Sequence, residues 1–428
     1  MEGLSLSSKK ITLIIVKLLV VCICIQHMVL NYMFGGKAGL SYSKEILVFL
    51  LLLVLLPKIG AKVRIDAFQF MAFMGFIFCL FISSILFSNM NAFVYSARKY
   101  ILPVLVCFLL HITSFFSDRK CRNSVYKFVI DFFVVLSIWG IFQILVLKDT
   151  FLMNLGYDTI FGHLDYTFYF NNFYFLQRNA STFASPNIFA CLLSIVILAL
   201  MMIGDELYKK KRDINIRMII LVSSLLLTFS RGSIISLFIV YFLFFLKKRK
   251  ISTGRFKYII GAIIIGVMAI CVVNSVMNIN IIETVFDWIA RTLSGSESSS
   301  AGRSFIWKLA FDELLNNPWG IGAGTAGINA NSLLTEQFAC ENSYLVMGLE
   351  SGVLGLVCYL IFINSFTLRT KENKHIIKVI LSFIMINFMF SNHIQDVEVM
   401  MILYLFVEGL YSNRKVVDTR KNECIKNV

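Results

Sequence analysis

Apolar residues occur along this chain in long runs, and short groups of charged residues separate each run from the next. Many runs continue for about 20 residues, which is the length that an α-helix needs to cross a bilayer. A transmembrane barrel would show short segments of alternating apolar and polar residues instead. We therefore predict an all-α polytopic membrane protein, with residues 1–428 as a single integral membrane domain of about 12 transmembrane helices. The predicted helices lie near residues 11–30, 43–57, 66–87, 99–116, 125–147, 186–204, 215–229, 232–247, 258–277, 343–367, 376–391 and 399–412.

The composition agrees with this class of protein. The chain of 428 residues is 58% hydrophobic and only 15% charged, which differs from the balance of a soluble domain. The net charge of +15 could point to nucleic acid, but the basic residues lie in short links between predicted spans, so we predict no nucleic-acid partner. The first apolar run begins near Ile11 without a small-residue cleavage site, and we expect it to remain as a helix. Most of the ten cysteines fall in predicted spans and Cys340 is alone in its link, so we expect neither a disulfide framework nor a metal site.

The distribution of lysine and arginine predicts which links face the cytoplasm. Basic segments such as PKIGAKVR, KKKRDINIR and KKRKISTGRFK alternate with links that hold few bases, which predicts that both termini are cytoplasmic. On the extracytoplasmic side two links are long, residues 148–185 and residues 278–342. Links of this length are usually functional or disordered, so the sequence indicates that the site lies on this side.

One arginine interrupts the apolar segment LLLTFSRGSIISLF, which runs from Leu225 to Phe238. A guanidinium in hydrocarbon costs several kcal/mol, and the basic links before and after this segment are both predicted to be cytoplasmic. The chain must therefore turn at the extracytoplasmic face, and we expect Gly232 to supply the backbone freedom for that turn. This interpretation places Arg231 at the extracytoplasmic rim.

Two further arginines lie in the long links. Arg178 precedes a helix expected to begin at Pro186, whose free N–H groups would favour an anion. Arg303 lies in AGRSFIWKLAFDELLNNP, which we predict to be a helix at the membrane surface that ends at Pro318. Guanidinium groups bind phosphate oxygens in pairs, so convergence of Arg178, Arg231 and Arg303 would suit a lipid pyrophosphate. Pairing with acidic residues of the same links is the alternative.

The remaining candidates are acid–base and polar groups. The glycine-rich segment NPWGIGAGTAG is either a hinge or a backbone cradle for phosphate. Glu341 lies where the second long link meets the next helix, and at a partly dehydrated rim it could serve as a general base. Glu350 lies two turns deeper, either as a functional carboxylate or as a structural hydrogen-bonding group. His393 and Asp396 in SNHIQDVE, and His163 in the first long link, are further acid–base candidates on this side.

Four segments in this order resemble the successive motifs of the O-antigen ligase and polymerase superfamily: QRNASTFASPN, LLLTFSRGSIISL, GRSFIWKLAFDELLNNPWGIGAG and ENSYLVMGLESGVLGL. The resemblance covers roughly residues 170–365. It implies the multi-helix type-C glycosyltransferase architecture, with an active site on the extracytoplasmic face of the bacterial inner membrane. The donor it implies is a glycan on undecaprenyl pyrophosphate, held through that pyrophosphate by Arg178, Arg231 and Arg303. It also implies an inverting transfer that uses no metal ion or other cofactor.

The chain departs from the ligase pattern at one place. In the ligases a histidine followed by asparagine precedes the tenth span, and here Glu341 and Asn342 stand at that position. The difference favours a polymerase that joins lipid-linked repeat units into O-antigen, capsule or exopolysaccharide. The predicted site residues are Glu341 and Arg231 as catalytic residues, Arg178, Arg231 and Arg303 as pyrophosphate-binding residues, and Asn342, Glu350 and His393 as secondary candidates.

The sequence leaves two alternatives open. A ligase would share the fold and donor but would transfer the glycan to a lipid A core, a protein or a wall polymer. A lipid-linked oligosaccharide flippase would need ionisable residues along a path through the membrane, for which Glu350 and Asp131 are the candidates. The partners expected for a polymerase are the undecaprenyl-pyrophosphate-linked donor and acceptor, the lipid bilayer, a chain-length regulator and a flippase.

Overall fold

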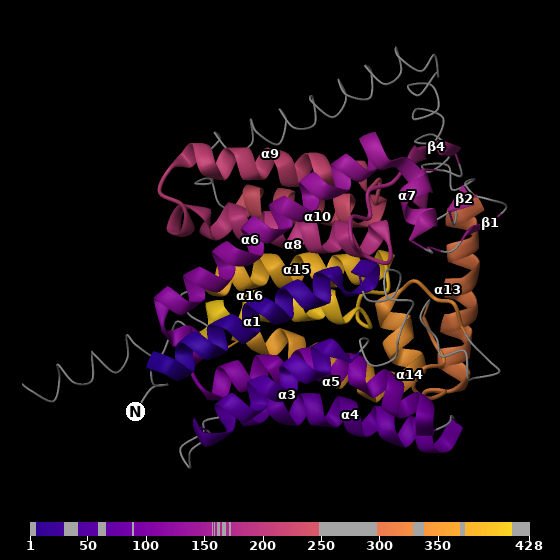
Figure 1. The fold of residues 1–428 in the computed structure, drawn as a ribbon. Helices are drawn as coiled ribbons and strands as arrows, with labels where there is room; N and C mark the ends of the chain where they lie inside the picture. Colours follow the sequence, from indigo (N-terminus) through magenta and orange to yellow (C-terminus); the bar gives the residue numbers. More distant parts are fainter. Residues whose placement is uncertain are drawn as a thin grey trace, which may run out of the picture.

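Long helices lying side by side make up most of the protein (Figure 1). The computed structural model describes residues 6–29, 42–58, 66–87, 90–155, 157, 159–160, 163–164, 168–170, 173–247, 298–327, 338–368 and 373–412. The long helices are α1 (Leu6–Gln26), α3 (Ser43–Leu55), α4 (Ala67–Phe87), α5 (Met90–Ile112), α6 (Arg119–Phe142), α8 (Pro186–Leu207), α9 (Lys211–Leu227), α10 (Arg231–Lys247), α13 (Ser298–Asn316), α14 (Ser343–Leu368), α15 (Lys374–Phe390) and α16 (Val397–Tyr411). The shorter ones are η2 (Leu56–Lys58), η3 (Phe115–Ser117), the π-helix η4 (Gln143–Leu147) and α7 (Lys148–Asn154). Every predicted helix that falls on described residues is present, and the one predicted at 258–277 lies outside them.

The length and apolar character of the helices confirm a polytopic membrane protein. Six helices in the described ranges are long and apolar enough to cross a membrane: Ser7–Val29, Ala67–Phe87, Met90–Ile112, Arg119–Asn154, Pro186–Leu207 and Ser343–Leu368. Large apolar side chains such as Met71, Phe78 and Val94 are exposed on these helices, as expected where lipid covers the protein.

The two most deeply buried helices are α8 and α16. Nearly every side chain of both helices is buried, which explains why their sequences are apolar on all sides. Around this pair α14 packs against α4, α10 against α15, and α5 against α16. The core therefore runs from one end of the bundle to the other and holds the helix ends in fixed positions.

Several elements that do not belong to the long parallel helices lie together at one end of the bundle, which we call the loop end (Figure 1). They are α7, α13 and two short antiparallel hairpins, β1 (Thr159–Ile160) with β2 (His163–Leu164) and β3 (Tyr169–Phe170) with β4 (Phe173–Gln177). The helix predicted around Arg303 is present as α13, which contacts α14 and runs across the ends of the other helices. Its side chains Phe305, Phe311 and Leu315 are exposed, which suits a helix at a membrane surface.

The reversal between α9 and α10 does not use Gly232 as predicted. Phe229 carries the left-handed backbone of this turn, with a φ of 50°. Thr228 Oγ1 accepts a hydrogen bond from Ser230 N at 3.2 Å, which closes the turn. Gly232 lies inside α10, where an added Cβ would come within 2.8 Å of Phe390 Cβ. The prediction for Gly232 is therefore wrong: the glycine permits close packing of α10 on α15, not the reversal of the chain.

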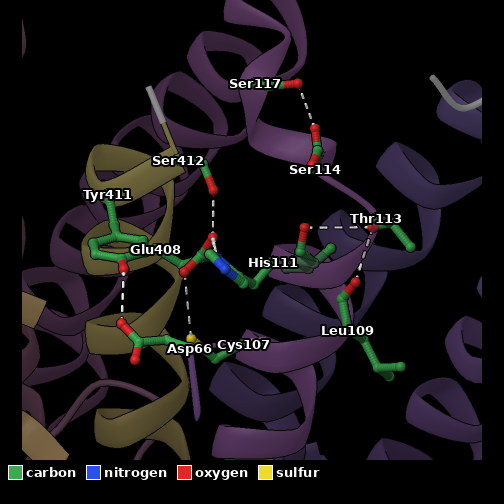
Figure 2. A network of polar contacts seen from close by, with 11 residues as sticks. Asp66, Cys107, Leu109, His111, Thr113, Ser114, Ser117, Glu408, Tyr411 and Ser412 are labelled. Carbon is green, nitrogen blue, oxygen red and sulfur yellow. Dashed lines mark hydrogen bonds and ion pairs between the residues drawn. The ribbon is translucent and has the colours of Figure 1, made fainter. Parts of the chain in front are cut away.

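At the opposite end of the bundle a polar network joins α5 to α16 (Figure 2). His111 Nδ1 lies 2.9 Å from Glu408 Oε1, and both side chains are buried. The same carboxylate is the partner of Cys107 Sγ at 3.9 Å and accepts a hydrogen bond from Ser412 Oγ. These contacts fix the last turn of α16 against the last turns of α5.

Candidate functional site

Arg178 is held between the ends of three elements at the loop end. Its backbone N–H donates to Phe168 O at 2.8 Å, which ties it to the hairpin region. Its guanidinium donates from Nε to Thr228 O, at the end of α9, and from Nη2 to Asn187 Oδ1, in the first turn of α8, both at 2.8 Å. These bonds fix the position of the guanidinium before any ligand binds.

Arg231 and Arg303 lie close enough to Arg178 to change its ionisation. Burial, together with the positive charges of Arg303 and Arg231, lowers the pKa of Arg178 to about 10, while the negative charge of Glu341 acts in the opposite direction. Arg231 is the first residue of α10, three residues after the carbonyl that Arg178 binds. Three arginines from distant parts of the sequence therefore lie within electrostatic reach of one another, and Arg178 remains protonated at neutral pH.

Glu341 is the carboxylate of this group. Its Oε2 lies 2.7 Å from Arg303 Nε, in an ion pair that joins α13 to the segment entering α14. Both side chains are about one-third exposed, at 36% for Arg303 and 29% for Glu341, so solvent and ligands can reach the pair. With three guanidinium groups and one carboxylate, this group has an excess of positive charge, which favours an anion.

Two helix N-termini add to the positive potential of the site. At the start of α8, Ser185 Oγ accepts hydrogen bonds from Asn187 N and Ile188 N at 3.1 and 3.4 Å. At the start of α14, Asn342 Oδ1 accepts from Tyr344 N and Leu345 N at 2.9 and 3.2 Å. Both helices therefore direct their positive ends towards the arginines.

Asn342, a predicted secondary candidate, has a structural position. Besides capping α14, it donates from Nδ2 to Met389 O at 3.2 Å and so connects α14 to the end of α15. Its amide oxygen and nitrogen are both used within the protein, so the geometry favours capping over catalysis for this residue.

Glu350 is also occupied by protein groups. It is fully buried and accepts hydrogen bonds from Tyr100 OH at 2.6 Å, Gly324 N at 2.7 Å and Gln395 Nε2 at 2.9 Å. These donors come from α5, from the glycine-rich segment and from the chain before α16. Of the two sequence interpretations, the geometry favours the structural hydrogen-bonding group.

The glycine-rich segment is anchored to α4 and does not offer a phosphate cradle. Gly322 N donates to Ser83 Oγ at 2.9 Å and Ala323 N donates to Ser84 Oγ at 3.0 Å, while Gly324 N binds Glu350. These three amides already have protein acceptors, which leaves none of them for phosphate. The positive φ values of Gly322 and Gly324, 97° and 80°, are needed to bring the amides to these acceptors.

His393 lies beside the start of α14 and forms a pair with Asp396. His393 Nδ1 lies 2.8 Å from Asp396 Oδ2, and the two residues are only 2% and 6% exposed. The backbone N–H of His393 donates to Ser343 Oγ at 3.0 Å, two residues after Glu341. The structure thus ties the backbone of His393 to the start of α14, close in the chain to Glu341, whereas His163 lies in β2 and its side chain falls outside what the structure describes.

Sequence reasoning missed the polar residues that hold this arrangement together. Asn187 and Thr228 fix Arg178, and Ser83, Ser84 and Tyr100 fix the glycine-rich segment and Glu350. Asn187 follows a helix-start signal and was recognisable as part of the QRNASTFASPN motif, but a serine inside an apolar run gives no sign of its partner. Within the described ranges no group of three or more His, Cys, Asp or Glu side chains is placed to hold a metal ion.

The fold and the arginine group define a polytopic membrane protein with a cationic site at one end of its helix bundle. A family model described as O-Antigen ligase matches residues 216–360. An O-antigen polymerase of Salmonella muenchen is 24% identical to the chain over 271 residues, which are 63% of this chain and 66% of the relative, slightly less than two thirds of its length. Both matches support the resemblance of the motifs to the O-antigen ligase and polymerase superfamily.

Proposed function

We propose that this protein is a polymerase-type glycosyltransferase that joins glycan repeat units carried on undecaprenyl pyrophosphate. The observation that supports the proposal most directly is the convergence of Arg178, Arg231 and Arg303 at the loop end of a membrane bundle. The similarity to an O-antigen polymerase over 63% of the chain supports the same class of reaction.

The arginines suit a diphosphate leaving group. Each guanidinium presents a planar fork that binds two phosphate oxygens. When the bond from the sugar to the phosphate oxygen breaks, negative charge grows on that oxygen, and cations already in position stabilise it. The arginines would therefore bind the donor and also lower the barrier to departure of the lipid pyrophosphate, with inversion at the sugar carbon.

In this proposal Glu341 changes its partner when the donor binds. Before the donor binds, the carboxylate pairs with Arg303 at 2.7 Å. A diphosphate carries more negative charge than one carboxylate, so it replaces Glu341 as the partner of Arg303. The released carboxylate then lies beside the sugar, where it orients the acceptor hydroxyl.

We place the reaction at the extracytoplasmic face of the bacterial inner membrane, with both termini in the cytoplasm. The proposal rests on the alternation of basic and non-basic links along the chain. Both substrates would be anchored in the same bilayer by their lipid tails, which makes their encounter nearly intramolecular. A flippase that delivers the units and a chain-length regulator are the protein partners that such a reaction needs.

The test is substitution of each arginine by lysine, which keeps the charge but removes the fork. We expect R178K, R231K and R303K each to lower the polymerisation rate about 10- to 100-fold, from the loss of charged hydrogen bonds, and to shorten the polymer seen on gels. The matched control is Arg122→Lys, because Arg122 is buried and binds Glu206 at 3.0 Å at the opposite end of the bundle. Normal polymer length in all three variants at normal protein level would contradict the proposal.

A ligase is the second candidate, because the matching family model carries that description. Deletion of the gene separates the two functions. If polymer is lost while single units are still attached to their final acceptor, the protein is the polymerase. If lipid-linked polymer accumulates without attachment, the protein is the ligase.

A further inference from the structure

The last turn of α15 and the chain that joins it to α16 bury polar side-chain atoms that have no partner in the described ranges. His393 Nε2, Asn392 Oδ1 and Asn387 Oδ1 are buried and have no hydrogen-bond partner in the part of the chain that the structure describes. Buried polar atoms in folded proteins nearly always have a partner. Three such atoms in one short segment indicate a place that receives hydroxyl groups from a ligand or from water.

The segment is directly connected to the arginine group on two sides. Asn387 Nδ2 donates to Ser233 Oγ at 3.1 Å, two residues after Arg231. His393 N donates to Ser343 Oγ at 3.0 Å, two residues after Glu341, and two residues of chain span at most about 7 Å. A sugar whose diphosphate lies on the arginines would therefore be close to this segment.

The pairing of His393 selects the form of the imidazole that accepts a proton. When Nδ1–H donates to the Asp396 carboxylate at 2.8 Å, Nε2 carries the free lone pair. The carboxylate also stabilises the imidazolium that forms when Nε2 takes a proton. The geometry of this pair is that of a general base held in position by an acid residue.

We propose that His393, held by Asp396, is the general base of the glycosyl transfer, and that Asn387 and Asn392 help to bind the hydroxyl groups of the acceptor sugar. The inference rests on the proposed function and adds to it the residue that takes the proton. Among the acid–base candidates that the sequence left open, it assigns the proton transfer to His393. Glu341, which pairs with Arg303 before the donor binds, keeps the role of orienting the acceptor hydroxyl.

The proposed step is balanced in protons and electrons. The acceptor hydroxyl oxygen forms a bond to the anomeric carbon as its proton passes to His393 Nε2. The bond from that carbon to the phosphate oxygen breaks, and its electron pair leaves with the lipid pyrophosphate. The proton on the imidazolium then passes to water, which restores the neutral base.

Other charged groups also act on this pair. Lys99 on α5 and Glu398 on α16 both interact electrostatically with Asp396. The thiol of Cys191 on α8 lies near the same carboxylate. These side chains are present in every variant below, so the comparison between variants tests His393 and Asp396 against the same background.

The experiment measures polymerisation by the full-length protein in lipid nanodiscs. The substrate is the lipid-linked repeat unit extracted from cells in which the gene for this protein is deleted. We expect His393→Gln to lower kcat about 10²- to 10⁴-fold, the usual contribution of a general base, with little change in KM. We expect the acidic limb of the pH–rate profile to disappear in the same variant. The matched control is His111→Gln, which alters the other buried histidine–carboxylate pair and should leave rate and profile unchanged.

Two outcomes would overturn the inference. One is a folded H393Q protein with wild-type kcat and pH profile. The other needs no variant: a wild-type rate that stays flat between about pH 5 and 8, where histidines titrate, would exclude a histidine base even if H393Q does not fold. Active wild-type protein with active H393Q overturns only the role of His393, whereas wild-type protein that makes no polymer overturns the proposed function itself.

Discussion

Two buried histidine–carboxylate pairs lie at opposite ends of α16, and their surroundings differ. At one end His111 faces Glu408, and that carboxylate also binds Cys107 and Ser412 (Figure 2). At the loop end His393 faces Asp396, and the second ring nitrogen of this histidine has no partner in the described ranges. The 12 residues from Asp396 to Glu408, at 1.5 Å each, separate the carboxylates by about 18 Å along the helix.

Both pairs consist of a histidine and a carboxylate, so only their surroundings indicate that one has a structural role and the other a chemical role. The carboxylate of the His111 pair is bonded on all sides by the protein, so the pair holds helices together. A pair with one unsatisfied buried nitrogen can bond a ligand, and the segment of this pair is hydrogen-bonded to Ser343, two residues after Glu341 of the arginine group. Single changes at matched positions of the two pairs should therefore have different consequences.

The largest difference is expected when each carboxylate becomes an amide. Asp396→Asn should lower turnover about 100-fold, because the neutral amide does not stabilise the imidazolium of His393. Glu408→Gln should leave turnover unchanged and cost about 1–3 kcal/mol of stability through a weakened buried network. Rates across pH and thermal unfolding in nanodiscs measure both effects, and equal loss of turnover in the two variants would remove the distinction.

A smaller effect is expected when an anion is added, because only the loop end of the bundle carries the arginine group. Inorganic pyrophosphate should stabilise the wild-type protein by about 2.7 kcal/mol at one hundred times its dissociation constant, because the arginine group gains a counter-charge. The pKa of Arg178, lowered to about 10 by burial and by Arg303 and Arg231, lies below its value in the unfolded chain. The charge of Arg178 therefore destabilises the fold below about pH 10, and this cost falls gradually as the pH rises from about 10 towards the pKa of arginine in the unfolded chain.

The anion effect should accordingly shrink as the pH rises towards 10. Unfolding temperatures with and without pyrophosphate, between neutral pH and pH 10, measure this dependence. Arg178→Gln should weaken the effect and Arg122→Gln, at the opposite end, should not. An equal response in these two variants would mean that pyrophosphate binds elsewhere.

The smallest effect is expected from the serine that accompanies each pair. Ser343 Oγ accepts the backbone N–H of His393, and Ser412 Oγ donates to Glu408. Replacing either serine by alanine should cost about 1 kcal/mol of stability. Only S343A should also lower turnover, because it loosens the segment that carries the proposed base. Unchanged turnover in S343A would show that this bond does not position His393.

The apolar pattern predicted the helices well but placed some of their starts too late. The helix predicted from residue 99 begins at Met90, and the one predicted from residue 125 begins at Arg119. The first turn of α6 contains Arg119, Lys120 and Arg122, and the first part of α5 contains Arg98 and Lys99, which an apolar pattern rejects. In the structure Arg98 has partners near the start of α3: its guanidinium lies 3.5 Å from Glu45, and its Cζ lies 5.6 Å from the centre of the Tyr42 ring. Such partners depend on tertiary packing, which the local sequence does not contain.

For the candidate site, too, the residue types were recognisable in the sequence, whereas their arrangement depends on the fold. The sequence identified Arg178, Arg231 and Arg303 by their chemistry and their predicted side of the membrane, but their convergence depends on α13 crossing the end of the bundle. The three-residue spacing of His393 and Asp396 was visible in the sequence. The unsatisfied nitrogen was not, because it depends on every element packed around it. For the same reason the structural use of Glu350, which weakens the case for a flippase path, could not be read from its position in a span.

The bonds from Gly322 and Ala323 to Ser83 and Ser84 have a consequence for hybrid proteins. The region matched by the family model, residues 216–360, contains these two amides but not the hydroxyls that receive them, and it contains neither Arg178 nor His393. Exchanging that region alone between two homologues would place these two N–H donors opposite the residues that another protein has at the positions of Ser83 and Ser84. A working chimera of this architecture would need α4, the Arg178 segment and the end of α15 to be transplanted along with it.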